Sequence, residues 1–190
     1  MSDTRQRILD AAREVERELG ADRLTMRTIA ARVGVTATAL YRHFKNKDEL
    51  IGALRAEDAQ TFQSYLERAM EHDRPGHRLA YSAWAYLDFA LDHPELYRSF
   101  FIATPTTAIE RKMVGTVRVK TFAFLRDRID DCMRAGVIPD GDASQIAIEV
   151  WAHMHGHISL YLAGAVAGTA ESFRDTYARS IDRLFAALAG

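Results

Sequence analysis

Hydrophobic residues recur along almost the whole chain at the three- and four-residue spacing of an α-helix. No segment alternates between apolar and polar residues over a useful length, as a half-buried strand would. The four prolines, Pro75, Pro94, Pro105 and Pro139, lie where these helical patterns break, because proline lacks the backbone N–H that a helix interior needs. The pattern therefore predicts an all-α protein of nine helices with no sheet.

Capping residues and breaks in the apolar stripes set the helix boundaries. Asn46 and Glu49 have the spacing of a capping box, and so do Asp142 and Gln145. The expected helices cover residues 2–19, 25–34, 36–44, 46–72, 76–92, 94–102, 106–135, 142–164 and 170–188.

Residues 25–44 combine two short helices with a sharp turn. Isolated helices of two turns are unstable in water, so packing must hold them. Ile29, Leu40 and Phe44 can supply that packing against the apolar side of the first helix. Gly34 lies where the chain reverses, and we expect a positive φ there. A short helix, a glycine-containing turn and a second short helix form the helix-turn-helix arrangement.

The net charge of the chain is only −1, but the charges are unevenly distributed. Residues 23–47 contain six cations and no acid, so the other 19 cations stand against 26 acids, a net charge of −7. A basic segment on an acidic body is typical of a protein that contacts nucleic-acid phosphates. The alternative is a basic surface that is merely solvated.

The outer face of the helix at 36–44 suits the major groove of DNA. Ala37 and the Thr38 methyl group can contact a thymine methyl, and Arg42 can hydrogen-bond a base edge. Tyr41 and His43 can donate to phosphate oxygens. The small residues at the start of this helix allow its backbone to approach the groove closely.

The stretch "LTMRTIAARVGVTATALYRHFKNKDEL" resembles the DNA-binding domain of the tetracycline-repressor (TetR) family of bacterial transcription regulators. The residues that match the family pattern are Thr25, Ile29, Ala30, Gly34, Val35, Thr36, Leu40, Tyr41, His43, Phe44, Asn46, Lys47 and Leu50. The resemblance implies a three-helix DNA-binding head, a helical ligand-binding and dimerisation body, and a homodimer. The DNA contacts that it implies are Thr25, Arg27, Thr36, Ala37, Thr38, Ala39, Tyr41, His43 and Lys47.

From the resemblance we expect two domains, a helix-turn-helix domain at 1–46 and a body at 47–190, with the helix at 47–72 connecting them. The implied function is that of a cytoplasmic repressor that leaves a palindromic double-stranded DNA operator when a small molecule binds. One alternative is a regulator controlled by a partner or by no ligand at all. A remote alternative is a helical enzyme or carrier with a vestigial head.

The body is rich in aromatic residues, which in a helical protein usually form the core. The stretch "EVWAHMHGHISLYLAG" resembles a subgroup of the same family marked by Trp-x-x-x-His-Gly, here Trp151, His155 and Gly156. Because the family has a cavity between its middle helices, a largely apolar ligand is expected. The candidate ligand residues are Trp84, Phe101, Met113, Phe122, Trp151 and His155.

Glu149, His153 and His157 lie on one stripe of the helix at 142–164. They could be structural or interfacial, a polar group of a pocket, or ligands of zinc. A zinc site usually draws ligands from a second element and none is visible, so we expect no metal and no cofactor. The sequence also lacks a nucleophile elbow or a phosphate loop, so an enzyme has almost no support.

The last helix carries an apolar stripe that is too long to leave in water at a chain end. Its members are Phe173, Tyr177, Ile181, Leu184, Phe185 and Leu188. We expect this stripe and the helix at 142–164 to form a four-helix bundle across a two-fold axis. The single cysteine, Cys132, fits a reducing cytoplasm. Glu149 and three histidines interrupt the apolar run at 146–168, which argues against a membrane span.

Overall fold

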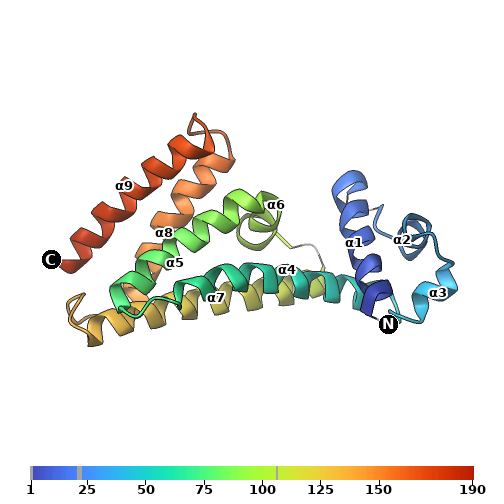
Figure 1. Cartoon of the computed structure of the whole chain (residues 1–190), viewed down its shortest axis with the longest axis horizontal. Coiled ribbons are helices and arrows are strands. Elements are labelled where there is room, and N and C mark those ends of the chain that lie inside the picture. Colours follow the sequence, from blue (N-terminus) through green and yellow to red (C-terminus); the bar gives the residue numbers. More distant parts are fainter. Residues whose placement is uncertain (1, 21–22, 106) are drawn as a thin grey trace. The chain divides into compact units, whose positions relative to one another are not determined.

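A computed structural model describes residues 2–20, 23–105 and 107–190 (Figure 1). Within these ranges the chain forms nine α-helices and one π-helical turn, and no strand, so the all-α prediction is confirmed. The helices are α1 Ser2–Leu19, α2 Met26–Val33, α3 Ala37–Tyr41, α4 Lys47–Ala69, α5 Pro75–Asp92, α6 Pro94–Tyr97, α7 Ala108–Arg134, α8 Ala143–Leu162 and α9 Ala170–Ala189.

The helix expected at 94–102 divides into α6 and a π-helical turn, η2, at Arg98–Ile102. The Ala103 N–H donates to the Arg98 carbonyl at 2.7 Å, the five-residue spacing of a π-turn. The consecutive residues Phe100 and Phe101 of this turn are both buried.

Helix α3 is shorter than predicted, because its end tightens into three-residue hydrogen bonds. The N–H groups of Arg42 and His43 donate to the carbonyls of Ala39 and Leu40. The helix expected from residue 106 begins at Ala108, after a cap in which Thr107 and Glu110 bond each other reciprocally. Thr106 lies outside the described residues.

The chain forms two compact units. The first contains residues up to Ala59 together with 107–113, and the second contains Gln60–Pro105 and Val114–Gly190. Helices α4 and α7 each contribute residues to both units. The division into domains 1–46 and 47–190 concerns independent folding and function, and stays a prediction.

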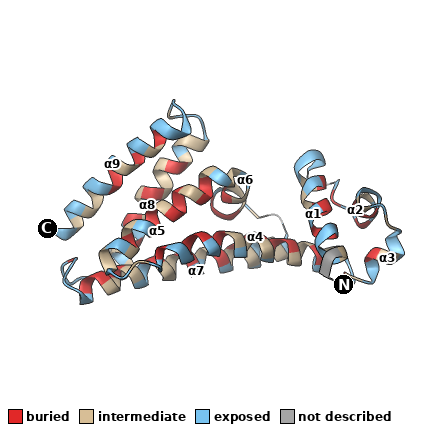
Figure 2. Ribbon diagram, in the orientation of Figure 1, coloured by how far each residue is buried: buried red, intermediate tan, exposed pale blue. Residues whose placement is uncertain are grey.

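The core of the first unit joins α1, α2, α3 and the start of α4 (Figure 2). Ile29, Leu40 and Phe44 are buried in it, as the sequence predicts, and Val33 and Val35 pack at its edge. Gly34 ends α2 with φ 77°, so its expected left-handed conformation is confirmed. The core fixes α3 with one face inward and the opposite face in solvent.

Helix α5 is the central element of the second unit. It packs against α6, α8 and α9, and buried residues lie around most of its circumference, as expected of a helix enclosed on several sides. They are Leu79, Ser82, Ala83, Ala85, Tyr86, Leu87, Phe89 and Ala90. The aromatic residues of this helix thereby reach both α8 and α9.

Candidate nucleic-acid interface and aromatic body cluster

A reciprocal cap between two threonines begins α2. The Thr25 hydroxyl accepts from the Thr28 N–H at 3.1 Å, and the Thr28 hydroxyl accepts from the Thr25 N–H at 2.9 Å. Both Thr25 and Arg27 are exposed. The cap therefore fixes the first turn of α2 and leaves the Arg27 side chain open to a partner.

Helix α3 begins at a second threonine cap. The Thr36 side chain accepts from the Ala39 N–H at 3.1 Å, which holds the start of the helix rigidly although only five residues are helical. The exposed residues of this segment are Thr36, Ala37, Thr38, Tyr41 and Arg42. Ala39 and His43 are half-buried and Leu40 is buried, so the expected inward and outward faces are confirmed.

A third cap begins α4. The Asn46 side chain accepts from the Glu49 N–H at 2.8 Å, and the Glu49 carboxylate accepts from the Lys45 N–H at 2.7 Å. The predicted pairing of Asn46 with Glu49 is confirmed, although the return bond reaches Lys45 rather than Asn46 itself. Lys47, the first residue of α4, is half-buried.

One cation of the basic segment is neutralised within the chain. Arg32 pairs with Glu14 at 3.3 Å and with Glu18 at 2.7 Å, both on α1. The hydrogen bond from Arg32, and then its charge, lower the pKa of Glu18. In the described ranges, the segment's other cations form no ion pair; they are Arg23, Arg27, Arg42, Lys45 and Lys47. The free positive charge of this segment is therefore smaller than the sequence indicates.

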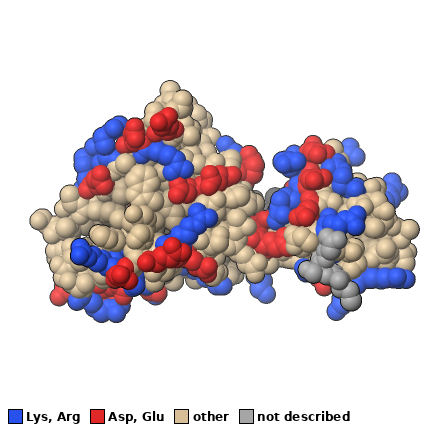
Figure 3. Space-filling model, viewed as in Figure 1, with Lys and Arg blue, Asp and Glu red and all other residues tan. Residues whose placement is uncertain are grey.

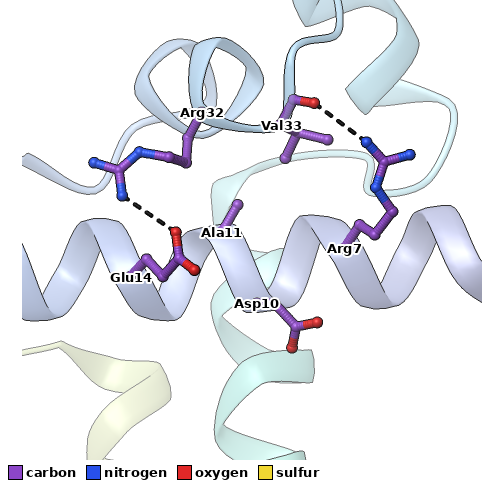
Figure 4. Close-up of a pocket in the computed structure, with 6 residues that line it drawn as sticks. All are labelled: Arg7, Asp10, Ala11, Glu14, Arg32 and Val33. Atoms are coloured by element: carbon purple, nitrogen blue, oxygen red, sulfur yellow. Dashed lines mark hydrogen bonds and ion pairs between the residues drawn. The ribbon is translucent and has the colours of Figure 1, made fainter.

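Figure 3 shows one face of the molecule, on which acidic atoms over α1 lie among Lys and Arg atoms and further Lys and Arg atoms lie at the outer edge near α2 and α3. A shallow pocket between α1 and α2 contains both signs of charge (Figure 4). In it Arg7 donates to the Val33 carbonyl at 3.5 Å and Arg32 pairs with Glu14. The charges of this pocket join the two helices to each other.

A buried ion network, which the sequence gives no means of predicting, links α1 to α4. Asp58 is 1% exposed and accepts from Arg13 at 2.8 Å and from Arg55 at 3.1 Å. Arg55 also pairs with Glu16. Burial opposes the charge of Arg55, but the bonds to Glu16 and Asp58 outweigh it and raise the pKa of that guanidinium. The network ties the end of the first unit's α4 segment to α1.

In the second unit, aromatic rings surround a polar chain. The Tyr97 hydroxyl lies in a hydrogen bond with His155 Nδ1 at 2.7 Å, and Trp151 Nε1 donates to the Tyr86 hydroxyl at 3.2 Å. Burial, and then the charge of Arg118, lower the pKa of His155. The other ring nitrogen, Nε2, lies 3.2 Å from the Ser159 hydroxyl, so both ring nitrogens of His155 have hydroxyl partners.

The structure brings together some of the predicted ligand residues but not all of them. The Trp151 ring lies 6.2 Å from Phe101 and 6.3 Å from Phe122, centroid to centroid. Trp84 packs instead on Tyr177 of α9 at 6.0 Å. Met113 belongs to the first unit and the other five residues to the second. Sequence reasoning missed Tyr86 and Tyr97 as residues of this cluster, because nothing in their spacing distinguishes them from core aromatic residues.

His153 and His157 both bond the same hydroxyl. Each Nε2 lies 2.8 Å from the Oγ of Ser180 on α9, which is 4% exposed. Burial, and then the charges of His153 and Arg183, lower the pKa of His157. Over the described residues, no three His, Cys, Asp or Glu side chains form a group that could hold a metal ion. The histidine pair therefore joins α8 to α9.

The apolar stripe of α9 is divided between the interior and the surface. Phe173, Tyr177 and Ile181 are buried within the single chain, and the Tyr177 hydroxyl donates to the Ala83 carbonyl at 3.0 Å. The rest of the predicted interface is half-buried, namely Leu184, Phe185 and Leu188. On α8, Ile148 is 54% and Leu160 is 52% exposed. No helix within the described ranges is both long and apolar enough to span a membrane.

Two family descriptions match the chain. Residues 8–54 match bacterial regulatory proteins of the tetR family, and residues 79–187 match a tetracyclin repressor-like C-terminal domain. The second match alone covers more than half of the 190 residues. The matches therefore include both the helix-turn-helix segment and most of the body. Neither description distinguishes the Trp-x-x-x-His-Gly subgroup, which stays a prediction.

Individual relatives agree with these matches. A helix-turn-helix transcriptional repressor of Mycobacterium tuberculosis is 36% identical over 64 residues, 34% of each chain. A TetR transcription regulator of Haloarcula marismortui has a TM-score of 0.77 at 20% identity, over 96% of this chain and 98% of that one. AibR, solved with isovaleryl coenzyme A and operator DNA, has a TM-score of 0.67 at 20% identity, over 91% and 95%. These two structures establish the fold alone, and the chain spans about a third to a half of the length of the curated relatives it matches first.

Proposed function

Because the chain belongs to the TetR family of bacterial regulatory proteins, we propose that it is a homodimeric transcription regulator that binds double-stranded DNA and is released by a small molecule. One observation carries the DNA-binding part of this proposal. The capped, outward face of α3 is flanked by exposed cations that form no ion pair in the described ranges. Such a surface suits phosphates on both sides of a groove.

Each exposed residue of the interface has a role that its chemistry permits. Thr36, Ala37 and Thr38 enter the major groove, and Arg42 reads a base edge. Tyr41, half-buried His43 and Lys47 contact phosphates. Thr25 and Arg27 do the same from the first turn of α2, where N–H groups without intrahelical partners attract anions.

We place the dimer contact on α8 and α9. The exposed side chains of Ile148 and Leu160, with half-buried Leu184 and Leu188, offer an apolar surface to a second copy. Phe173, Tyr177 and Ile181 support α9 from beneath, because they are already enclosed by their own chain. Two-fold symmetry would then present two α3 helices to half-sites about 34–36 Å apart on a palindromic operator.

The ligand would bind in the second unit, beside the aromatic and polar groups of Trp151, Tyr86, Tyr97 and His155. Apolar walls with a few hydrogen-bonding groups are usual for a small-molecule site. A ligand that binds better to a conformation in which the two α3 helices of the dimer do not match the spacing of the half-sites lowers the population of dimers that can bind DNA. Helix α4 contributes to both units and is suited to carry that change. The cytoplasm is the compartment in which we place this activity.

Selection of bound fragments from genomic DNA tests the function. We expect enrichment of a palindromic site, and the purified chain should bind that site as a dimer. Recovery of no sequence above background, with folded protein, would contradict the proposal. The relatives named above are regulators, so an enzymatic role receives no support from them.

A second candidate is a regulator that needs no ligand. The polar groups of the body cluster already bond one another, from Trp151 through Tyr86 and from Tyr97 through His155 to Ser159. A body whose interior is filled by its own side chains would leave no room for a ligand, and the chain would then bind DNA without one. Thermal unfolding in the presence of a metabolite library separates the two candidates, because only a ligand-controlled protein gains stability from a specific compound.

A further inference from the structure

Arg5, in the first turns of α1, lies against the end of the α3 segment. Its guanidinium carbon is 4.8 Å from the centroid of the Phe44 ring. Phe44 is buried, at 1% exposed, so the ring is a fixed platform. A planar guanidinium stacks well on such a face. The position of this charge is therefore set by the core of the first unit, although the Arg5 side chain itself is exposed.

Three other arginines of α1 and α2 already have partners within the chain. Arg13 pairs with Asp58, Arg32 pairs with Glu18, and Arg7 donates to the Val33 carbonyl. Among the side chains that the structure describes, none forms an ion pair with Arg5 or accepts a hydrogen bond from it. With respect to the described side chains, its donors are therefore available to a ligand outside the chain.

Phe44 places this charge beside the cations that follow it. Lys47 is three residues further on, so its Cα lies at most ~11 Å from that of Phe44. Phosphates of one DNA strand advance by about 3.4 Å along the helix axis. This bound allows Arg5 on the Phe44 ring and Lys47 to contact phosphates of the same duplex.

We infer that Arg5 is a phosphate-contacting residue of the DNA interface, and that the interface therefore extends from the helix-turn-helix segment onto the start of α1. The inference rests on the proposed DNA-binding function and adds a residue to it. The contribution of Arg5 to binding should not depend on the DNA sequence, because its partner is the backbone of the duplex.

The test is the salt dependence of binding to a labelled duplex of mixed sequence, measured between about 50 and 200 mM salt. The variants are Arg5→Ala, Arg5→Gln and Arg5→Lys, of which Arg5→Gln keeps part of the stem that covers Phe44. The matched control is Arg17→Ala, which removes another exposed arginine from the opposite end of α1. Thermal unfolding of each variant checks that it is folded.

Loss of one phosphate contact should lower the slope of log affinity against log salt by about 0.9, and should weaken binding about fivefold at 0.15 M salt. We expect this of Arg5→Ala and Arg5→Gln, with the slope retained in Arg5→Lys and in the Arg17 control. Wild-type slopes in both uncharged variants would overturn this inference and leave the proposed function intact. If the wild-type chain bound no duplex at all, the proposed function would fall first and the role of Arg5 with it.

Discussion

Arg13 of α1 donates to the buried carboxylate of Asp58 on α4 at 2.8 Å. The same carboxylate accepts from Arg55 at 3.1 Å, and Arg55 also pairs with Glu16 of α1. One acidic side chain therefore holds two cations between two helices. Removal of that acid takes one of its two carboxylate partners from the largely buried guanidinium of Arg55, which costs more than loss of an exposed pair.

Asp58→Asn should consequently lower the free energy of unfolding of the first unit by about 3 kcal/mol. The control is Asp10→Asn, because Asp10 pairs with Arg13 only at 3.8 Å and is exposed. Urea unfolding of both variants, monitored by circular dichroism, provides the comparison. Equal free energies of unfolding for Asp58→Asn and Asp10→Asn would show that the network stabilises the chain no more than an exposed ion pair does.

Lys47 and Arg32 both belong to the basic segment but should behave differently. Lys47→Ala should weaken binding to every duplex and lower the salt slope by about one unit, because a phosphate contact is lost. Arg32→Ala should leave that slope unchanged, since Arg32 is paired with Glu14 and Glu18. Titration of labelled DNA at several salt concentrations measures both. A flattened slope for Arg32→Ala would mean that its ion pairs open on DNA.

Arg42 is exposed on the outer face of α3 and should read a base rather than a phosphate. Arg42→Ala should then relax discrimination at one position of the selected site, by about 1–3 kcal/mol. Competition among single-base variants of the site measures this. Uniform weakening on all of them would assign Arg42 to the phosphate backbone.

The stability of the second unit should fall as the solution becomes acidic. The pKa of His155 is lowered by burial and then by the charge of Arg118, and the pKa of His157 by burial and then by His153 and Arg183. Below the ordinary histidine value of 6.5 the unfolded chain binds protons that the folded chain does not, so the free energy of unfolding decreases as pH falls. His155→Gln should flatten this dependence in urea unfolding between about pH 7.5 and 5. An unchanged slope would show that His155 protonates freely in the folded chain.

Ile148 and Leu160 are the apolar residues of α8 that remain most exposed. Ile148→Asp or Leu160→Asp should raise the dimer dissociation constant at least tenfold, about 1.4 kcal/mol, because a charge would be buried at the interface. Val119→Asp on α7 is the control, since Val119 is 69% exposed. Sedimentation measures the association. If only the Val119 variant dissociated, the interface would have to be moved to α7.

The local structure of the interface could be predicted because each step depends on neighbouring residues. Thr25 and Thr36 are caps, Gly34 permits a positive φ, and Leu40 has an inward position set by helical periodicity. The neutralisation of Arg32 could not be predicted, because Glu18 comes near it only when α2 packs on α1. Local charge counting therefore overestimated the free positive charge.

The body could be predicted only in outline. Helical periodicity identified its helices, but the polar chain depends on side chains that are far apart in sequence, such as Tyr97 and His155. Similarly, the stripe on α9 was identified as apolar, whereas the burial of Tyr177 under α5 depends on tertiary packing. The π-turn at Arg98–Ile102 has no periodicity long enough to reveal it.

The most direct measurement of the central claim is a hydroxyl-radical footprint of the chain on its selected DNA site. A dimer that presents two α3 helices should protect two symmetry-related patches centred about one helical turn apart, near 34–36 Å. Tyr41→Ala should weaken both patches equally, because the Tyr41 side chain is 51% exposed on that face. A single unsymmetrical patch, or protection that is unaffected by substitution of Tyr41 and Lys47, would contradict the account.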